Sequence, residues 1–185
     1  ELGKRAAAGL IRADGGHREA QSVFDDYIAR LVKQADFGAL SIVWDAGNGA
    51  AGPATEAMLA ALSDNGGALG THKTLYCDID GHFPNHHPNP VDPETLESLR
   101  EQVAALGADC GIGFDGDGDR IGLVDSKGRQ IAGDILTAFL ATDILTRNPR
   151  ADIIFDVKSS ALAMQIVRDA GGIPHLWKTG HSHMK

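Results

Sequence analysis

The segment Gly113-Phe114-Asp115-Gly116-Asp117-Gly118-Asp119-Arg120 carries three carboxylates at alternate positions, separated only by glycines. Apolar runs at 110–114 and 121–124 flank the acidic residues and predict a strand on each side. Three neighbouring anions repel one another and add no stability by themselves, so the simplest reason for the arrangement is a bound divalent cation. Carboxylate oxygens suit Mg²⁺, Mn²⁺ or Ca²⁺ better than Zn²⁺. The segment therefore predicts a site for a hard metal ion.

The two glycines between the aspartates have a geometric role. In a flat strand, residues two apart lie about 6.6 Å from each other, whereas two oxygens on one Mg²⁺ lie no more than about 4.2 Å apart. The segment must therefore curl inward. Gly116 and Gly118 permit the positive φ angles and the close backbone approach that such a curl needs.

Other kinds of site also begin with alternating aspartates. An EF-hand requires Gly at its sixth position and Glu at its twelfth, and Arg120 and Ser126 stand there instead, which excludes it. Two alternatives stay open. One is a phosphatase of the haloacid-dehalogenase type with Asp115 as its nucleophile, and the other is a solvated acidic turn in a hairpin.

Composition bounds the class of protein. With 185 residues, 43% apolar and 23% charged, the chain is expected to fold as one domain or two small ones. The formal net charge of −8, without a basic cluster, argues against nucleic acid and anionic membranes as partners. No apolar stretch reaches about 18 residues, so no membrane span is expected. Cys77 and Cys110 lie in predicted strand regions and are expected to be reduced thiols of a cytoplasmic protein.

Apolar spacing predicts the remaining elements. Helices are expected at 18–36, 53–65, 93–106, 133–147 and 160–170, and strands at 39–44, 68–76, 110–114, 121–124, 151–157 and 173–177. In the helix at 133–147, the residues predicted to face inward are Leu136, Phe139, Leu140 and Ile144. A strand, an Asp, small residues, a helix and a Gly-Gly pair occur twice, at 41–67 and 152–172, which suggests a duplicated α/β unit with a boundary near 124–127.

Three further segments are rich in glycine, proline or histidine. The glycine turn at 45–53 matches neither a dinucleotide fingerprint nor a P-loop, and a tight turn feeding a helix is the favoured interpretation. The segment 80–90 holds three prolines and three histidines without zinc spacing, which favours a rigid structural loop over a metal site. The segment 178–185 follows a strand and could form an anion or proton-transfer site, or a polar surface loop.

Taken together, these segments resemble the α-D-phosphohexomutases, and the bacterial phosphomannomutase/phosphoglucomutase branch in particular. Asp-Gly-Asp-Gly-Asp-Arg at 115–120 resembles the metal loop of that family. The segments 45–52, 80–90, 156–160 and 178–185 resemble its early glycine turn, its second-domain loop, a third-domain strand end and its catalytic loop, in the same order.

The resemblance implies an α/β fold with two consecutive three-layer α/β/α units and mixed, mostly parallel sheets. Residues 1–20 would be the tail of a preceding domain and a linker, 21–125 the second domain with the metal loop, and 126–185 the opening part of the third. The phosphoserine loop, the sugar-recognition loop and the fourth domain would be absent. The isolated chain is therefore expected to be inactive, and the other domains of the same chain are its expected partners.

The implied reaction is a Mg²⁺-dependent transfer of phosphate between O1 and O6 of a hexose, through a phosphoserine enzyme and a hexose 1,6-bisphosphate. The preferred hexose phosphate, whether glucose, mannose or glucosamine phosphate, stays open. Asp115, Asp117 and Asp119 would hold Mg²⁺, and Arg120 would stabilise the transferring group. Lys185 would act near the reacting oxygen. His181 and Ser182 would bind substrate. A metal-binding fragment without catalysis is the alternative from another class.

Overall fold

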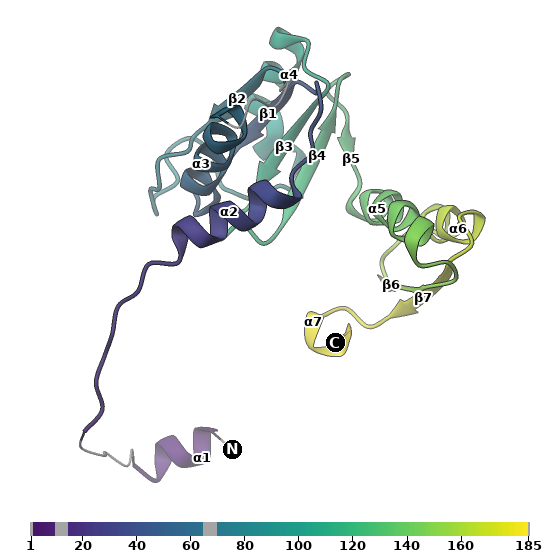
Figure 1. The fold of residues 1–185 in the computed structure, drawn as a ribbon. Helices are drawn as coiled ribbons and strands as arrows, with labels where there is room; N and C mark the ends of the chain where they lie inside the picture. The colour runs from purple at the N-terminus through teal and green to yellow at the C-terminus, as the bar shows by residue number, and fades with distance from the viewer. Residues whose placement is uncertain (1, 10–14, 65–69, 185) are drawn as a thin grey trace.

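The computed structural model of the protein describes residues 2–9, 15–64 and 70–184. Two sheets organise these residues (Figure 1): five strands in the order β2-β1-β3-β4-β5, and a separate pair of β6 and β7. The first sheet consists of β1 (Ile42–Asp45), β2 (His72–Leu75), β3 (Cys110–Phe114), β4 (Ile121–Asp125) and β5 (Gln130–Ile131). The predicted α/β class with mixed, mostly parallel strand pairing is confirmed.

The topology of the first sheet places three connecting segments at one edge. β1 pairs in parallel with β2 on one side and with β3 on the other. β3 then turns back through residues 115–120 into the antiparallel β4, which pairs with β5. Because the carboxyl ends of parallel strands share an edge, the segments that follow β1, β2 and β3 meet there.

Helices cover both faces of the first sheet. They are α2 (Phe24–Gln34), α3 (Ala51–Asp64), the 3₁₀ turn η1 (Pro93–Leu96) and α4 (Glu97–Leu106). Val43 packs with Leu99 and Val103 of α4 on one face. Ile42 and Trp44 point to the other face, where Met58 of α3 and partly buried side chains of α2 meet them. The first unit therefore has the predicted three layers, with β1 buried on both sides.

The ends of these elements follow local chemistry. Asp92 caps η1 by accepting a hydrogen bond from the Glu94 amide at 3.1 Å, and Gly107 ends α4 with a φ of +60°. The cap at Asp92 was expected from the sequence, and the left-handed Gly107 is a common way for a helix to end. The helix predicted at 18–36 is shorter than expected, because α2 begins only at Phe24. Cys77 was predicted to lie in a strand, and this is wrong, since β2 ends at Leu75.

The second unit contains α5 (Gly133–Arg147), β6 (Asp152–Asp156), α6 (Ala161–Asp169), β7 (Ile173–Trp177) and α7 (His181–Met184). The pair β6 and β7 is parallel, so its strand–helix–strand order repeats that of β1, α3 and β2. The side chains of α5 and α6 pack together with Phe155 and Ile153. Ile154, the residue between them, is 45% exposed. The described residues therefore build two of the three expected layers here. The strand predicted at 151–157 is confirmed as β6, but the expectation that it is a buried strand is wrong, because only one of its faces is covered.

The bounds of α5 agree with the prediction, but its buried face does not. Phe139 and Leu140 were predicted to face inward and are 67% and 50% exposed. The residues that pack against α6 are Ala138, Ala141 and Leu145. The small side chains of Ala138 and Ala141 let α5 and α6 approach closely. Packing against α6 therefore determines which of the apolar stripes on α5 is buried.

Three further observations concern the boundary between the two units, the helices of the described residues and α1. The first sheet continues past residue 125, because β5 pairs with β4 through Gln130 and Ile131; the division of the chain at 125 stays a prediction. Among the helices of the described ranges, none has the length and hydropathy that crossing a membrane requires. α1 (Leu2–Ala7) is exposed along its whole length.

Candidate metal centre

The hairpin turn between β3 and β4 brings together the three aspartates that the sequence singled out. One ligand atom from each of Asp115, Asp117 and Asp119 lies within 4.8 Å of those of the other two. Two oxygens on one Mg²⁺ lie at most about 4.2 Å apart. Asp117 and Asp119 are exposed, so rotation of their side chains can close the small difference. The donor set therefore fits a hard divalent cation.

The backbone of the turn explains how the carboxylates converge. The Gly118 amide donates to the Asp115 carbonyl at 3.1 Å, and Gly118 has a φ of +76°. This glycine has the left-handed conformation expected from the sequence. The same expectation is wrong for Gly116, whose φ lies outside the left-handed region. Gly116 instead provides close approach, as its carbonyl accepts a hydrogen bond from the Ala50 amide at 2.9 Å.

Asp115 is the buried member of the cluster, with 1% of its surface exposed. Its two oxygens accept hydrogen bonds from Arg120, one from the backbone amide at 2.9 Å and one from Nε at 2.7 Å. Arg120 Nε also lies 3.7 Å from an oxygen of Asp119. The side chain of Arg120 is 60% exposed, so its guanidinium is fixed at one end and open to solvent at the other.

The charges in the turn shift one another's pKa values in opposite directions. Burial opposes ionisation of Asp115, but the hydrogen bonds from Arg120 outweigh burial and hold the pKa of Asp115 below its usual range. The pKa of Asp119 is raised, mainly by the charge of Asp117. The pKa of Arg120 is raised by its hydrogen bond to Asp115. Repulsion therefore concentrates at the two exposed carboxylates, where a cation would relieve it.

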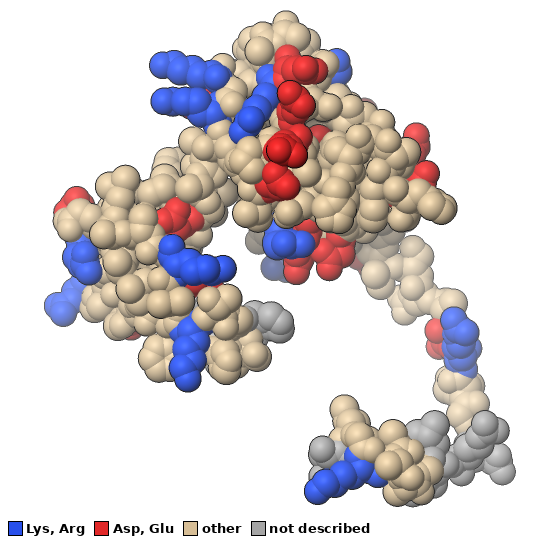
Figure 2. Space-filling model, turned by 180° about the vertical axis from the view of Figure 1, so that it is seen from behind, with Lys and Arg blue, Asp and Glu red and all other residues tan. Residues whose placement is uncertain are grey.

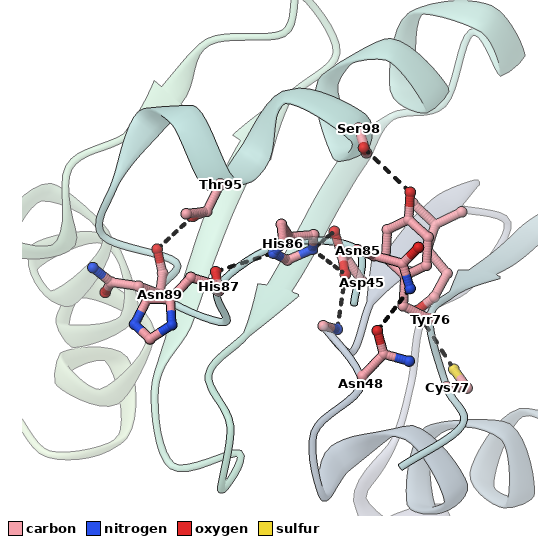
Figure 3. Close-up of polar contacts among 12 residues, drawn as sticks. Asp45, Asn48, Tyr76, Cys77, Asn85, His86, His87, Asn89, Thr95 and Ser98 are labelled. Carbon is pink, nitrogen blue, oxygen red and sulfur yellow. Dashed lines mark hydrogen bonds and ion pairs between the residues drawn. The ribbon is translucent and has the colours of Figure 1, made fainter. Parts of the chain in front are cut away.

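A second polar cluster lies beside the turn, at the ends of β1 and β2 (Figure 3). Asp45, 1% exposed, accepts from the Gly47 amide at 2.9 Å and contacts His86 Nε2 through both oxygens, at 3.1 and 3.0 Å. Asn48 donates to the Asp78 carbonyl and accepts from Asn85. The glycine turn is thus hydrogen-bonded to the histidine-rich loop.

This second cluster was not identified from the sequence. The glycine turn and the segment 80–90 were each interpreted as structural, and their contacts agree with that role. The pairing of Asp45 with His86 was missed, because the two residues lie 41 positions apart. A buried Asp at a strand end and a histidine in a proline-rich loop are the signals that could have suggested it.

The residues predicted to bind substrate, His181 and Ser182, belong to the second unit. α7 begins at His181, four residues after β7, so His181 and Ser182 lie beyond the carboxyl end of a strand, as expected. Ser182 is exposed. Lys185 lies outside the described residues. The structure therefore shows that this segment follows a strand. The roles predicted for its residues remain proposals.

The surface around the sheets carries both signs of charge. On the face drawn in Figure 2, acidic side chains form a row over the larger unit, and basic side chains lie among and beside them. The net charge of the chain is −8. Among residues 115–120 of the hairpin turn, Arg120 is the only basic residue.

Comparison with known proteins agrees with these features. Residues 25–128 match the family described as phosphoglucomutase/phosphomannomutase, alpha/beta/alpha domain II. A phosphomannomutase/phosphoglucomutase of Pseudomonas putida is 42% identical over 171 residues, which are 92% of this chain and 36% of that protein.

Solved structures share the fold as well. The crystal structure of a phosphoglucomutase/phosphomannomutase family protein from Burkholderia thailandensis has a TM-score of 0.88 and 40% identity, over 99% of this chain and 39% of that one. A more distant structure is the Aspergillus fumigatus N-acetylphosphoglucosamine mutase in complex with GlcNAc-6P and magnesium. It has 18% identity and a TM-score of 0.59, over 85% of this chain and 32% of that one.

The chain spans little more than a third of the length of the curated relatives that it matches most extensively. Within that span, the family match covers four strands of the first sheet, β1 to β4, including the hairpin turn with its three aspartates. The chain therefore belongs to the phosphoglucomutase/phosphomannomutase family, and its residues 25–128 correspond to the α/β/α domain II of that family.

Proposed function

We propose that the chain is part of a Mg²⁺-dependent phosphohexomutase that interconverts hexose 1-phosphate and hexose 6-phosphate, with mannose or glucose as the sugar. The observation that carries the proposal is the convergence of three carboxylates in a turn that belongs to a matched mutase domain. The magnesium complex of the Aspergillus fumigatus mutase supports the choice of ion. The phosphoserine enzyme and the bisphosphorylated sugar intermediate are parts of the same proposal.

Asp115, Asp117 and Asp119 would hold the Mg²⁺ ion. The ion would supply positive charge that stabilises the negative charge on a transferring phosphoryl group. Asp115 has a second role that the geometry supports directly, because its two oxygens orient Arg120 through the backbone amide and Nε. With one end fixed and 60% of its side chain exposed, Arg120 is placed to donate hydrogen bonds to a phosphate beside the turn.

The remaining roles come from the second unit and from the rest of the chain. His181 and Ser182 would contact the substrate, and Lys185 would act near the reacting oxygen. We place residues 1–20 in the tail of a preceding domain, 21–125 in the second domain and 126–185 in the opening part of the third. The enzyme would act in the cytoplasm, together with the other domains of the same chain.

The phosphatase alternative has less support. A nucleophilic aspartate must let a phosphorus atom with its oxygens approach the carboxylate. Asp115 is 1% exposed, which leaves a phosphate ester, much larger than a metal ion, little access to it. Trapping a phospho-aspartate at this position would nevertheless favour the phosphatase and defeat the mutase.

The test has two parts. A longer mutase chain carrying these residues is assayed with glucose 1-phosphate and mannose 1-phosphate, with and without Mg²⁺, and turnover is expected only with the ion. In parallel, calorimetric titration of the 185-residue protein with Mg²⁺ is compared for wild type, Asp117→Asn, and Asp64→Asn, an exposed carboxylate at the end of α3. Binding should be lost only in Asp117→Asn, and a metal-loaded longer chain without turnover of any hexose phosphate would defeat the proposal.

A further inference from the structure

The buried carboxylate of Asp45 joins two segments that are distant in the sequence. One of its oxygens accepts from the Gly47 amide at 2.9 Å, which fixes the start of the glycine turn after β1. Both oxygens also lie within 3.1 Å of His86 Nε2, from the loop after β2. Figure 3 shows His86 between Asp45 and the His87 carbonyl. Asp45 therefore links the glycine turn to residues 86–88.

The contacts of His86 define its charge. Nδ1 lies 3.1 Å from the His87 carbonyl oxygen, and Nε2 faces the Asp45 carboxylate. A carbonyl and a carboxylate only accept hydrogen bonds, so both contacts are hydrogen bonds when both ring nitrogens carry a proton. The hydrogen bond to Asp45 accordingly raises the pKa of His86. With His86 protonated, the two residues form an ion pair whose side chains are 16% and 1% exposed, and removing His86 would leave a buried charge without its partner.

The two linked segments both contact Gly116, which belongs to the hairpin turn with the three aspartates, residues 115–120, called the metal turn below. On one side, a Cβ built on Gly49 would lie 2.7 Å from the Gly116 carbonyl oxygen, and the Ala50 amide donates to that oxygen at 2.9 Å. On the other side, a Cβ on Gly116 would lie 3.4 Å from Phe83 and from Pro88. Pro88 also faces Gly47, where an added Cβ would lie 3.1 Å away.

These contacts connect the Asp45–His86 pair to the metal turn through the backbone of two segments. His86 sets the place of Pro88, Asp45 sets the place of Gly47 and the turn after it, and both segments contact Gly116. Gly116 lies between two of the three aspartates in the chain. In the described part of the chain, the side-chain hydrogen bonds of Asp45 and His86 go to each other, to the Gly47 amide and to the His87 carbonyl, so any effect on the three aspartates passes through the backbone of the turn.

We propose that Asp45 and His86 are positioning residues for the metal turn: their ion pair holds the two segments that set the separation of the metal-binding aspartates. The inference rests on the proposed function, since it assigns the pair a role at the proposed metal centre. Loss of the pair lets Gly116 move, and the three carboxylates then no longer converge without a free-energy cost. The expected signature is a weaker metal affinity in a protein that remains folded.

The test measures the dissociation constant for Mn²⁺ and for Mg²⁺ by calorimetry in four variants. His86→Ala and Asp45→Asn remove one partner of the pair and are expected to weaken binding about tenfold, the lower end of the range for residues behind metal ligands. His86→Gln keeps a donor towards Asp45 and should restore most of the affinity. Asp109→Asn is the control, because Asp109 accepts from the Ser41 amide at the opposite edge of the same sheet.

Circular dichroism confirms the fold of each variant, and if Asp45→Asn does not fold, His86→Ala decides alone. The inference is overturned if folded His86→Ala binds both ions as tightly as wild type, or if Asp109→Asn weakens binding equally. A wild-type protein that binds no divalent ion would overturn the metal centre itself. A protein that binds metal as described while the longer chain has no mutase activity would defeat only the proposed function.

Discussion

Gly49→Ala is the substitution that most directly probes the support of the metal turn. Gly49 has no left-handed backbone conformation, so alanine causes no φ strain there. The added Cβ would instead lie 2.7 Å from the carbonyl oxygen and 3.0 Å from Cα of Gly116. Real Cβ atoms essentially never approach closer than 3.0 Å, and both opposing atoms belong to backbone. The turn must therefore move by at least about 0.3 Å.

The free-energy cost follows from this forced movement. Overpacking a tight contact costs about 1–3 kcal/mol, and weakening the hydrogen bond from Ala50 to Gly116 adds up to about 1 kcal/mol. We expect the free energy of unfolding of the first unit to fall by about 2 kcal/mol. For a unit of about 100 residues, this loss corresponds to a Tm lowered by about 10 °C. Displacement of Gly116 should also weaken Mg²⁺ binding about tenfold.

Two matched glycine substitutions make the assay specific. A Cβ on Gly116 itself would meet Phe83 and Pro88 only at 3.4 Å, and one on Gly81 would meet nothing within 4 Å. Neither position has a left-handed φ, so Gly116→Ala and Gly81→Ala should stay within about 0.5 kcal/mol of wild type. Thermal unfolding followed by circular dichroism, with and without Mg²⁺, measures all three. If Gly49→Ala unfolds at the temperature of Gly81→Ala and binds Mg²⁺ normally, the argument from close contact is wrong.

Two other predictions address the ion pair and the second unit. Because the folded-state pKa of His86 is raised above 6.5, its contribution to stability is complete below pH 6.5 and is lost as the pH rises through the folded-state value. Urea unfolding from pH 6 upward should show this decline in wild type, and an identical decline in His86→Gln would contradict it. Ser160 caps α6 by accepting from the Ala163 amide at 3.2 Å, so Ser160→Ala should cost about 1 kcal/mol in chemical unfolding. Ser159→Ala is the control, and an equal loss there would refute the assignment of the cap.

Much of the secondary structure could be predicted because its signals are local. The bounds of α5 and β7 agree with the residues predicted from apolar spacing. The helix start predicted at Asp92 and Pro93 is confirmed, because Asp92 caps η1. The aspartates of the metal turn are only two positions apart, so a few backbone angles suffice to bring them together. Each of these features depends on a short run of residues, which is why the amino-acid sequence alone indicates it.

Other features depended on which surfaces meet. Several apolar stripes were available on α5, and only packing against α6 chose Ala138 and Ala141 over Phe139 and Leu140. The role of Gly116 as a point of close approach became evident only when the glycine turn after β1 lay against it.

The sequence by itself indicated most of the helices and strands, the cap at Asp92 and the identity of the clustered carboxylates, because each is specified by neighbours along the chain. Only the tertiary structure decided that the carboxyl ends of β1, β2 and β3 lie at the same edge of the sheet. It also decided that Asp45 pairs with His86, 41 positions further along the chain. The physical reason is that an ion pair between distant residues forms only after parallel strand pairing and burial have brought both to one place.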